Sequence, residues 1–276
     1  MVTEASIAAG LRSLGLDGAP AIVHSSLRSF GWVDGGAEAV CRALVEVCGT
    51  VLLPAGTWDR TAVPSPPGLV RPHNAVLSAA SWQEFDSALS AAVPLTTDLP
   101  VDGWLGRIPE AMRLAFEHVR GTHPLFSFLA VGTYASQLIA AERPDWPLGP
   151  LEALAALDGD VLLLGVTHTS NTTIHLAEQR LGRSRFYRYA KVAAGVWAEF
   201  PNIPGESHRF DEIEPLLVPV TREVQVGSCR IRRIPVREVL ACVERLVAAD
   251  PAALLCEDGS CRCGAALQQR LAHLQR

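Results

Sequence analysis

Short apolar runs alternate along this chain with segments in which apolar residues recur every three or four positions. The runs predict buried strands, and the recurrences predict helices with one apolar face. Strands are predicted at residues 19–26, 50–58, 127–132 and 160–166. Helices are predicted within residues 1–18 and at 35–49, 106–119, 134–142 and 172–182. The chain therefore begins helix–strand–helix–strand, which is the pattern of a βαβ unit.

The alternation changes in the last third of the chain. Residues 189–200 predict extended structure such as a hairpin, 209–218 a short helix, 224–236 a strand-like segment and 237–250 a helix. Earlier, the stretch 59–74 is rich in Pro and polar residues and predicts a loop. A loop of this length in a compact domain is often functional.

The whole chain is predicted to form one domain. It has 276 residues, of which 49% are hydrophobic, so it is long enough to bury one large core. No repeat or linker divides residues 1–276, although a cysteine-containing tail occupies about 251–276. We expect an α/β fold with a central mixed β-sheet flanked by helices.

Charge and hydropathy exclude several partners. The net charge of −5 disfavours a nucleic-acid-binding surface, which is normally basic. No apolar run is long enough to cross a bilayer, and the first residues lack the basic start of a signal peptide. We therefore expect a cytoplasmic protein with no membrane or nucleic-acid partner.

Polar residues follow three of the predicted strands directly. They are found in "HSSLRSFG" from residue 24, "AGTWD" from residue 55 and "VTHTSN" from residue 166. In α/β sheets, sites gather at the carboxyl ends of strands. We expect these three segments to converge on one cleft.

The segment "GVTHTSNTTIHLAE" (165–178) holds the densest chemistry and allows three interpretations. His168, His175 and Glu178 could bind a metal, although their spacing is not the zincin pattern. One histidine could instead be a general base oriented by a carboxylate. The third interpretation is a core histidine at 175, a surface histidine at 168 and a helix capped by Ser170, Asn171 or Thr172.

A second candidate segment is "HSSLRSFGWVDGG" (24–36). Ser25, Ser26 and Ser29 offer hydroxyls, and the glycines at 31, 35 and 36 allow close backbone approach. The Gly35–Gly36 pair opens a predicted helix, whose first N–H groups favour phosphate. The alternative is a capped loop without a ligand. Separately, Asp59, Glu199, Asp211 and Glu212 suit a cationic ligand or form a solvated acidic face.

Seven cysteines are present, an odd number. Cys256, Cys261 and Cys263 cluster in "CEDGSCRCG", with His273 beyond them. Their spacing matches no standard zinc ligand pair. Zinc, a disulfide and free thiols are all open interpretations.

Four ordered motifs resemble the antibiotic N-acetyltransferase family, whose best-known members are the aminoglycoside 3-N-acetyltransferases. The resemblance rests on "HSSLRSFGWVDGG", on "GRIPEAMR" with "THPLFSFLAVG", on "GVTHTSNTTIHLAE" and on "RFDEIEPLL". It covers residues from about 5 to 250, so the cysteine-rich tail lies outside it.

The resemblance implies acetyl transfer from acetyl-coenzyme A to an amine, commonly the 3-amino group of a 2-deoxystreptamine aminoglycoside, which gives antibiotic resistance. It implies no metal and no covalent intermediate, and a monomer or homodimer. His168 would be the general base and Glu178 the carboxylate that orients it, with oxyanion donors near Thr167 or Ser26. Coenzyme A would contact Ser25, Ser26, Leu27, Phe30, Gly31, Gly35, Gly36 and Ser127. The ammonium groups of the antibiotic would meet Asp59, Glu199 and Asp211.

One departure from the family pattern affects these expectations. Where the family has Gly-His-Asp, this chain has Thr167, His168 and Thr169, so a carboxylate beside the expected base is missing. The acceptor could therefore be a different amine, as in natural-product biosynthesis. A metal-dependent hydrolase using His168, His175 and Glu178 is a further alternative.

Overall fold

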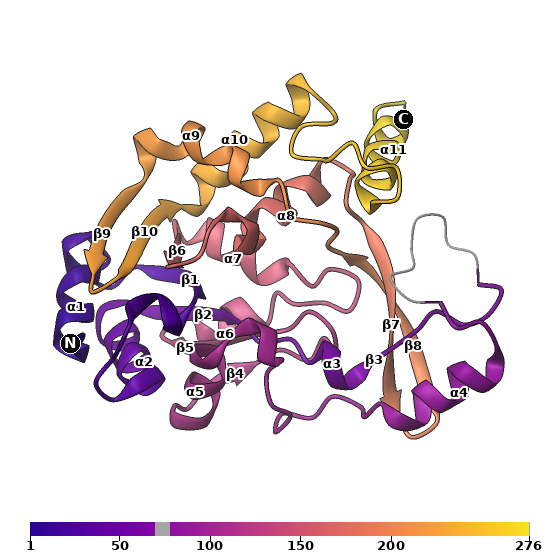
Figure 1. The fold of residues 1–276 in the computed structure, drawn as a ribbon, viewed down its shortest axis with the longest axis horizontal. Helices are drawn as coiled ribbons and strands as arrows, with labels where there is room; N and C mark the ends of the chain where they lie inside the picture. Colours follow the sequence, from indigo (N-terminus) through magenta and orange to yellow (C-terminus); the bar gives the residue numbers. More distant parts are fainter. Residues whose placement is uncertain (70–77, 276) are drawn as a thin grey trace.

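The computed structural model describes residues 1–69 and 78–275, and its centre is a seven-stranded mixed sheet (Figure 1). The strand order is β4–β5–β2–β1–β6–β10–β9. The strands are β1 (Pro20–Ser25), β2 (Thr50–Pro54), β4 (Val119–Arg120), β5 (Phe128–Gly132), β6 (Asp160–Leu164), β9 (Arg222–Val226) and β10 (Cys229–Pro235). Strand β1 runs parallel to β2 and β6, and the other pairs are antiparallel. The predicted α/β class with a mixed central sheet is confirmed.

Helices cover both faces of this sheet because its strands alternate their apolar side chains between the two faces. In β1, for example, Val23 belongs to one core cluster and Ile22 to the other. The first face packs against α1 (Glu4–Ser13), α2 (Gly36–Val47) and α5 (Arg107–Ala115). The second packs against α6 (Ala135–Ile139), α7 (Gly149–Ala156), α8 (Thr172–Arg180) and α10 (Val236–Ala249). The predicted opening βαβ unit is β1–α2–β2.

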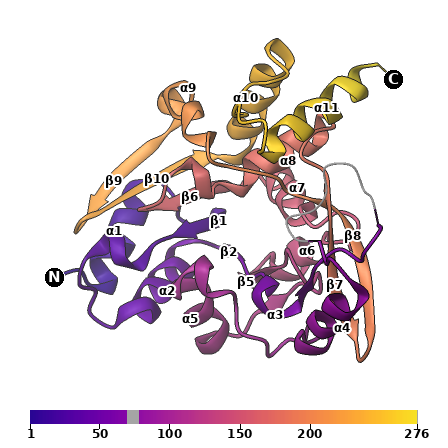
Figure 2. The same ribbon diagram turned by 45° about the vertical axis from the view of Figure 1, so that its right-hand side comes forward.

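A smaller antiparallel sheet lies beside the main one (Figure 2). It contains β3 (Ala62–Val63), β7 (Phe186–Ala193) and β8 (Val196–Ile203), and α4 (Trp82–Ala91) packs on it through Phe85 and Leu89. The β7–β8 pair confirms the hairpin predicted for 189–200.

The loop predicted for 59–74 is wrong in its first part. Helix α3 (Trp58–Thr61) and β3 occupy 58–63, and 70–74 lie outside the described residues. The reason is tertiary: the Asp102 carboxylate accepts the N–H groups of Trp58 and Asp59, which satisfies the first turn of α3 from a distant part of the chain.

Other predicted elements differ mainly at their ends. The helix predicted to Val119 ends at Ala115, because Arg120 in β4 is anchored to the Thr97, Leu99 and Ala55 carbonyls. The short helix predicted at 209–218 forms as a 3-10 turn η4 (Phe210–Ile213), α9 (Glu214–Leu217) and a 3-10 turn η5 (Val218–Val220). The segment 224–236 folds as the β9–β10 hairpin.

The C-terminal tail ends in α11 (Arg262–Leu274), for which the apolar pattern gave no prediction. Cys263 and two alanines of α11 pack on Phe186. Arg270 donates to the Leu181 carbonyl, so α11 also contacts the end of α8. No helix among the described residues is both long and apolar enough to cross a membrane.

Candidate active site

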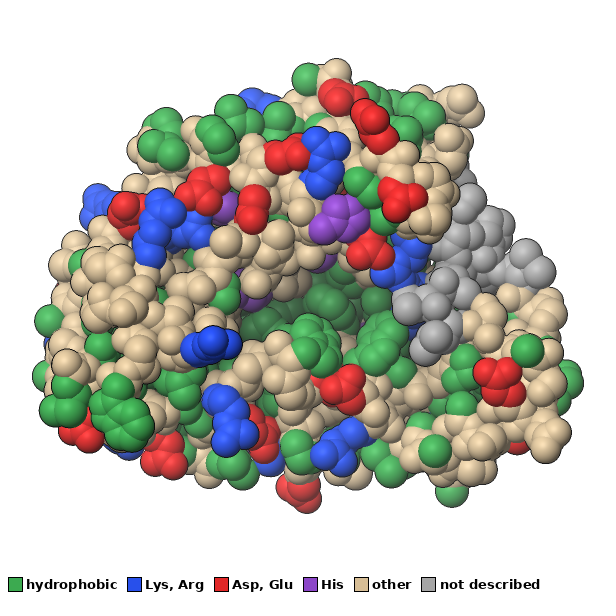
Figure 3. All heavy atoms as spheres, viewed as in Figure 1, with side chains coloured by type: hydrophobic (Ala, Val, Ile, Leu, Met, Phe, Trp, Pro, Cys, Tyr) green, Lys and Arg blue, Asp and Glu red, His purple; other side chains and the backbone are tan. Residues whose placement is uncertain are grey.

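A cavity of about 590 Å³ opens at the carboxyl ends of β1, β2 and β6. Its walls come from residues 23–28, from Pro54 and Gly56, and from 166 and 169–172, so the three predicted strand ends do converge. Residues 104–107 and 125–127 close the opposite side. Figure 3 shows the front of the molecule hollowed near its centre, with apolar side chains on the floor and histidines on the upper wall. Parallel strands produce this arrangement because their carboxyl ends meet at one edge.

His175 on α8 faces this cavity and is held from behind by a buried carboxylate. Its Nδ1 lies 3.0 Å from Oε2 of Glu178, the residue one helical turn later. Glu178 is fully buried; its Oε1 accepts a hydrogen bond from Arg183 Nε at 3.0 Å and forms an ion pair with Arg183 Nη2 at 2.9 Å. Because a carboxylate paired with a guanidinium only accepts, His175 Nδ1 must carry the proton. The free lone pair of His175 is therefore on Nε2.

Local signals in the sequence build this chain of contacts. The Asn171 side chain, one of the three caps that the sequence allowed, caps α8 by accepting the N–H of Thr173. Gly182 ends the helix with φ of 79°, and a Cβ there would meet the His273 ring at 2.4 Å. The turn brings Arg183 back onto Glu178, whose carbonyl accepts the Arg183 N–H at 3.0 Å. Residues 171–183 thus form one preorganised unit.

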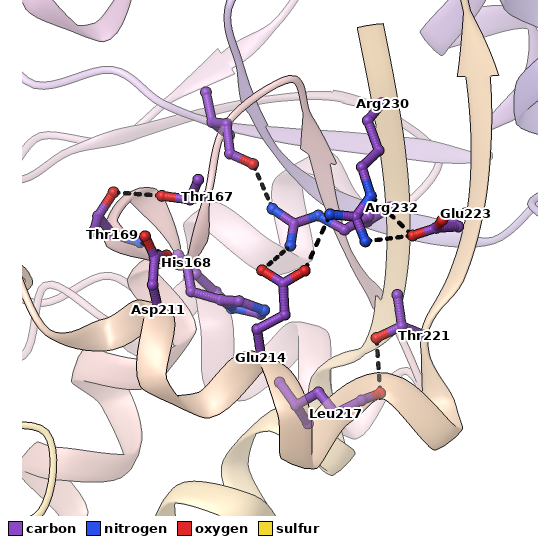
Figure 4. A network of polar contacts seen from close by, with 12 residues as sticks. Thr167, His168, Thr169, Asp211, Glu214, Leu217, Thr221, Glu223, Arg230 and Arg232 are labelled. Atoms are coloured by element: carbon purple, nitrogen blue, oxygen red, sulfur yellow. Dashed lines mark hydrogen bonds and ion pairs between the residues drawn. The ribbon is translucent and has the colours of Figure 1, made fainter.

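His168 lies in a different environment. It begins the 3-10 turn η3 (His168–Ser170), is buried, and is not among the residues that line the cavity. Its ring is directed toward Arg232 and Glu214, behind the turn that carries Thr167 and Thr169 (Figure 4). Burial lowers the pKa of His168 to about 4, helped by Arg232 and opposed by Glu214 and Asp211.

The predicted pairing of Glu178 with His168 is wrong. Glu178 contacts His175, which shares its helix face, whereas His168 Nδ1 lies 3.3 Å from the Asn171 side-chain amide. Arg232 is itself occupied, since it pairs with Glu214 at 2.7 Å and donates to the Val166 carbonyl. Among the described residues, His168, His175 and Glu178 also do not gather as a group that could hold a metal ion. The alternative metal site therefore has no support.

His24 was not predicted as a site residue. It is the first polar residue of the apolar strand β1, it is buried, and it lines the cavity. Its Nε2 accepts the Thr172 N–H at 3.4 Å. Burial lowers the pKa of His24 to about 3, with a further contribution from nearby His175, so His24 is neutral at pH 7. The transition from apolar to polar at the end of β1 was the signal that could have identified it.

The predicted coenzyme A contacts divide into two sets. Ser25, Ser26, Leu27 and Ser127 line the cavity. The Ser25 hydroxyl is buried and has no hydrogen-bond partner among the described residues. Phe30, Gly31, Gly35 and Gly36 are not lining residues: Phe30 is in the core, Gly31 ends the 3-10 turn η1 (Leu27–Phe30), and the two other glycines start α2.

Two cations and a second helix start were missed by the sequence analysis. Arg28 and Arg107 are exposed residues of the cavity wall, and Gly106 beside them has φ of 90° at the start of α5. The start of α5 therefore lies at the cavity. The helix start at Gly35–Gly36, which was expected to favour phosphate, does not line it.

The predicted acidic residues lie outside the cavity lining. None of the described lining residues is Asp or Glu. Asp59 is exposed on α3, and Glu199 on β8 accepts a hydrogen bond from Tyr189 at 3.0 Å. Asp211 accepts the N–H of Thr169, a residue of the cavity wall, at 3.2 Å. Of the three, Asp211 is placed at the rim.

Comparison with known proteins gives one consistent result. The family model described as "Aminoglycoside 3-N-acetyltransferase" matches residues 22–248. An aminoglycoside N(3')-acetyltransferase-like protein of Bacillus subtilis, YokD, is 32% identical and is matched over 76% of this chain and 79% of its own. Aminoglycoside N(3)-acetyltransferase IX of Micromonospora chalcea is 34% identical, with coverages of 76% and 75%.

Solved structures agree with the sequence comparisons. The apoenzyme of aminoglycoside acetyltransferase AAC(3)-IVa superposes with a TM-score of 0.77 at 26% identity, over 97% of this chain and 98% of that one. A variant of that enzyme has been crystallised with a gentamicin; it has a TM-score of 0.75 at 25% identity and covers 97% of both chains.

Proposed function

The chain belongs to the aminoglycoside 3-N-acetyltransferase family, and from that premise we propose that His175 is the general base of its acetyl transfer. Acetyl-coenzyme A is the donor that this family uses. We propose as acceptor the 3-amino group of a 2-deoxystreptamine aminoglycoside. Acetylation removes a positive charge from the antibiotic, and we propose resistance as the outcome.

The observation that carries the assignment of the base is the contact series His175–Glu178–Arg183. A general base needs a lone pair facing the substrate and a second nitrogen that fixes the tautomer. His175 has both, because it lines the cavity and its Nδ1 is 3.0 Å from a carboxylate paired with Arg183. His24 beside it is neutral at pH 7, so it adds no repulsion when His175 takes up a proton.

The reaction balances without a metal or a covalent enzyme intermediate. The acceptor ammonium loses one proton to the solvent on reaching its reactive free-amine form. As the amine nitrogen attacks the thioester carbon, His175 Nε2 takes the second N–H proton and an N–C bond forms. The tetrahedral oxyanion collapses, the C–S bond breaks, and the imidazolium returns the proton to the coenzyme A thiolate. A positioned base of this kind contributes about 10²- to 10⁴-fold to the rate.

Coenzyme A is proposed to lie along the wall from Ser25 to Arg107. The unpartnered Ser25 hydroxyl is suited to donate to the thioester oxygen or to an amide of the pantetheine arm. The phosphates would meet the guanidinium groups of Arg28 and Arg107 at the start of α5. Ser26, Leu27 and Ser127 complete this side of the cavity. Gly35 and Gly36 do not line the cavity, so they have no part in this proposed binding of the phosphates.

The antibiotic is proposed to enter from the rim that Asp211 occupies. Asp211 is exposed and bonded to Thr169 of the wall, so its carboxylate is available to an ammonium group at the mouth. Neither Asp59 nor Glu199 lines the cavity, so they are weaker candidates that would require a substrate extending well beyond it.

A second class of acceptor is favoured by one observation. The wall carries Thr169 where the family has Asp, and none of the described lining residues is acidic. An amine with fewer cationic groups than a typical aminoglycoside would suit such a wall.

The test is release of the coenzyme A thiol from acetyl-coenzyme A with a panel of amines. The panel contains deoxystreptamine aminoglycosides, the same compounds already acetylated at N3, and simple monoamines. We expect rapid release only with the first group, an N3-acetylated product by NMR, and higher inhibitory concentrations for cells that express the protein. Release with monoamines alone would establish the second class. No release with any amine would contradict both.

We further propose that the enzyme works in the cytoplasm as a monomer or homodimer. Subcellular fractionation and light scattering of the purified chain test these two points.

A further inference from the structure

Four potential metal ligands that do not line the cavity meet at one place. They are His208, Cys256, Cys261 and Cys263, and their ligand atoms all lie within 4.8 Å of one another. His208 Nε2 and Cys263 Sγ are 3.8 Å apart. In a tetrahedral site with Zn–S bonds of about 2.3 Å, ligand atoms are separated by about 3.8 Å. Small side-chain adjustments would therefore bring all four onto one ion.

We propose that these four residues bind a structural zinc ion that fastens the C-terminal tail to the active-site wall. Three thiolates and one imidazole form a closed Cys₃His set, which is typical of structural zinc and leaves no position open for chemistry. The family match ends at residue 248, before the three cysteines, whereas His208 lies within it. The proposal goes beyond the acetyl transfer and does not depend on it.

Two of the cysteines lie at the start of a helix. Cys261 is the N-cap of α11 and Cys263 lies in its first turn, where the helix dipole stabilises negative charge. A thiol that coordinates a cation loses its proton, so a metal at this place would hold all three cysteines as thiolates.

The imidazole ligand also has a partner behind it. His208 Nδ1 lies 4.0 Å from the Glu206 carboxylate, and Glu206 is paired in turn with Arg262 at the start of α11. The Glu206 carboxylate is on the Nδ1 side of the ring, whereas Nε2 lies 3.8 Å from Cys263 Sγ and is the nitrogen that would bind the metal. A disulfide would use two of the three cysteines and would leave His208 and the remaining thiol beside it unexplained.

The position of His208 gives the proposed ion a structural consequence. The preceding residue, Ser207, lines the cavity, and Phe210 packs edge-on against the His175 ring at 4.7 Å. Asp211, one residue further, bonds to Thr169. Zinc would therefore link the segment 207–211, which contacts the active site, to the three cysteines of the C-terminal tail.

Metal content of the full-length protein is the first test. The chain is purified under reducing conditions without added metal, and zinc is measured by mass spectrometry. We expect about one zinc ion per chain for the native protein. Cys256→Ser and Cys261→Ser should lose it, whereas Cys242→Ser, a change at a buried cysteine of α10, should retain it. Far-UV circular dichroism checks that each variant is folded.

Cobalt substitution provides a readout that does not depend on purification history. After chelation of the native metal, Co²⁺ alone is added to the full chain. We expect thiolate-to-cobalt charge-transfer bands and tetrahedral d–d bands, both lost in Cys256→Ser. Absence of stoichiometric zinc together with absence of these bands would overturn the proposal. A disulfide among the three cysteines in cells, shown by alkylation and mass mapping, would overturn it as well.

Discussion

His175 and His168 are seven residues apart in one segment, both buried, and yet in opposite chemical situations. His175 presents one nitrogen to the cavity and the other to Glu178 at 3.0 Å. His168 lies behind the wall, with an amide at 3.3 Å and the Arg232–Glu214 pair in front of its ring (Figure 4). Near His175 a carboxylate is committed to the histidine, whereas near His168 the carboxylate of Glu214 is committed to arginines.

The difference shows what makes a buried histidine a base. Burial alone suppresses protonation, as the pKa of about 4 for His168 illustrates. A base needs in addition a buried counter-charge that stabilises its protonated form without itself being neutralised. Arg183 keeps Glu178 in that role, because a buried carboxylate is tolerated only when it is paired. The proposed catalytic unit therefore includes an arginine that does not line the cavity.

The largest effect is expected on kcat when each of the two histidines is replaced in turn. His175→Gln should lower kcat about 10²- to 10⁴-fold with little change in the affinity for coenzyme A. His168→Gln should leave kcat within several-fold, because its ring does not reach the substrate. Thiol release and coenzyme A titration measure the two quantities. The reverse ranking would restore His168 as the base and would overturn the assignment made here.

Glu178→Gln tests whether the carboxylate acts through the tautomer of His175. The glutamine amide can donate to Nδ1, which would move the ring proton to Nε2 and remove the lone pair from the cavity. We expect at least about a 100-fold loss in kcat. The change also leaves Arg183 buried without its counter-ion, which costs about 3–5 kcal/mol in urea unfolding. Glu214→Gln is the matched control on the His168 side, and an equal loss of kcat there would refute the distinction.

How much the sequence could predict follows from the same comparison. The i,i+3 spacing of His175 and Glu178 was visible, and so were the apolar strand before them and the asparagine cap. The choice between the histidines was not, because the position of Arg183 depends on the turn at Gly182 and that of Arg232 on the β6–β10 pairing. Long-range placement likewise decided that Gly106 and Arg107, rather than Gly35 and Gly36, line the cavity.

Buried histidines that stay neutral make the stability of the fold depend on pH. The pKa is lowered by burial to about 4 for His168 and to about 3 for His24 and His123, against 6.5 when unfolded. Below pH 6.5 the unfolded chain takes up protons that the folded chain does not, so stability falls as the pH decreases toward 4. Each histidine contributes at most about 1.4 kcal/mol per pH unit.

One carboxyl group opposes this trend. Burial raises the pKa of Glu142 from 4.5 to about 7, so its contribution is present at low pH and is lost as the pH rises through 7. Three histidines outweigh one carboxyl, and we expect net destabilisation by acid. Urea unfolding at pH 7 and pH 5 measures it. His168→Gln should reduce the difference between the two pH values, and an unchanged difference would mean that His168 is protonated in the folded protein.

The smallest effect is expected for Asp211→Asn, which tests whether the wall beside His168 contributes to substrate binding. Asp211 caps the Thr169 N–H beside His168 while its carboxylate remains exposed at the rim. Because exposed ion pairs are weak, Asp211→Asn should raise KM for an aminoglycoside about two- to five-fold and leave kcat unchanged. Asp86→Asn, an exposed change on α4, is the control and should alter neither. If kcat falls instead of KM rising, then Asp211 acts by holding the turn behind His175, and the two sides of the wall are mechanically coupled rather than separate.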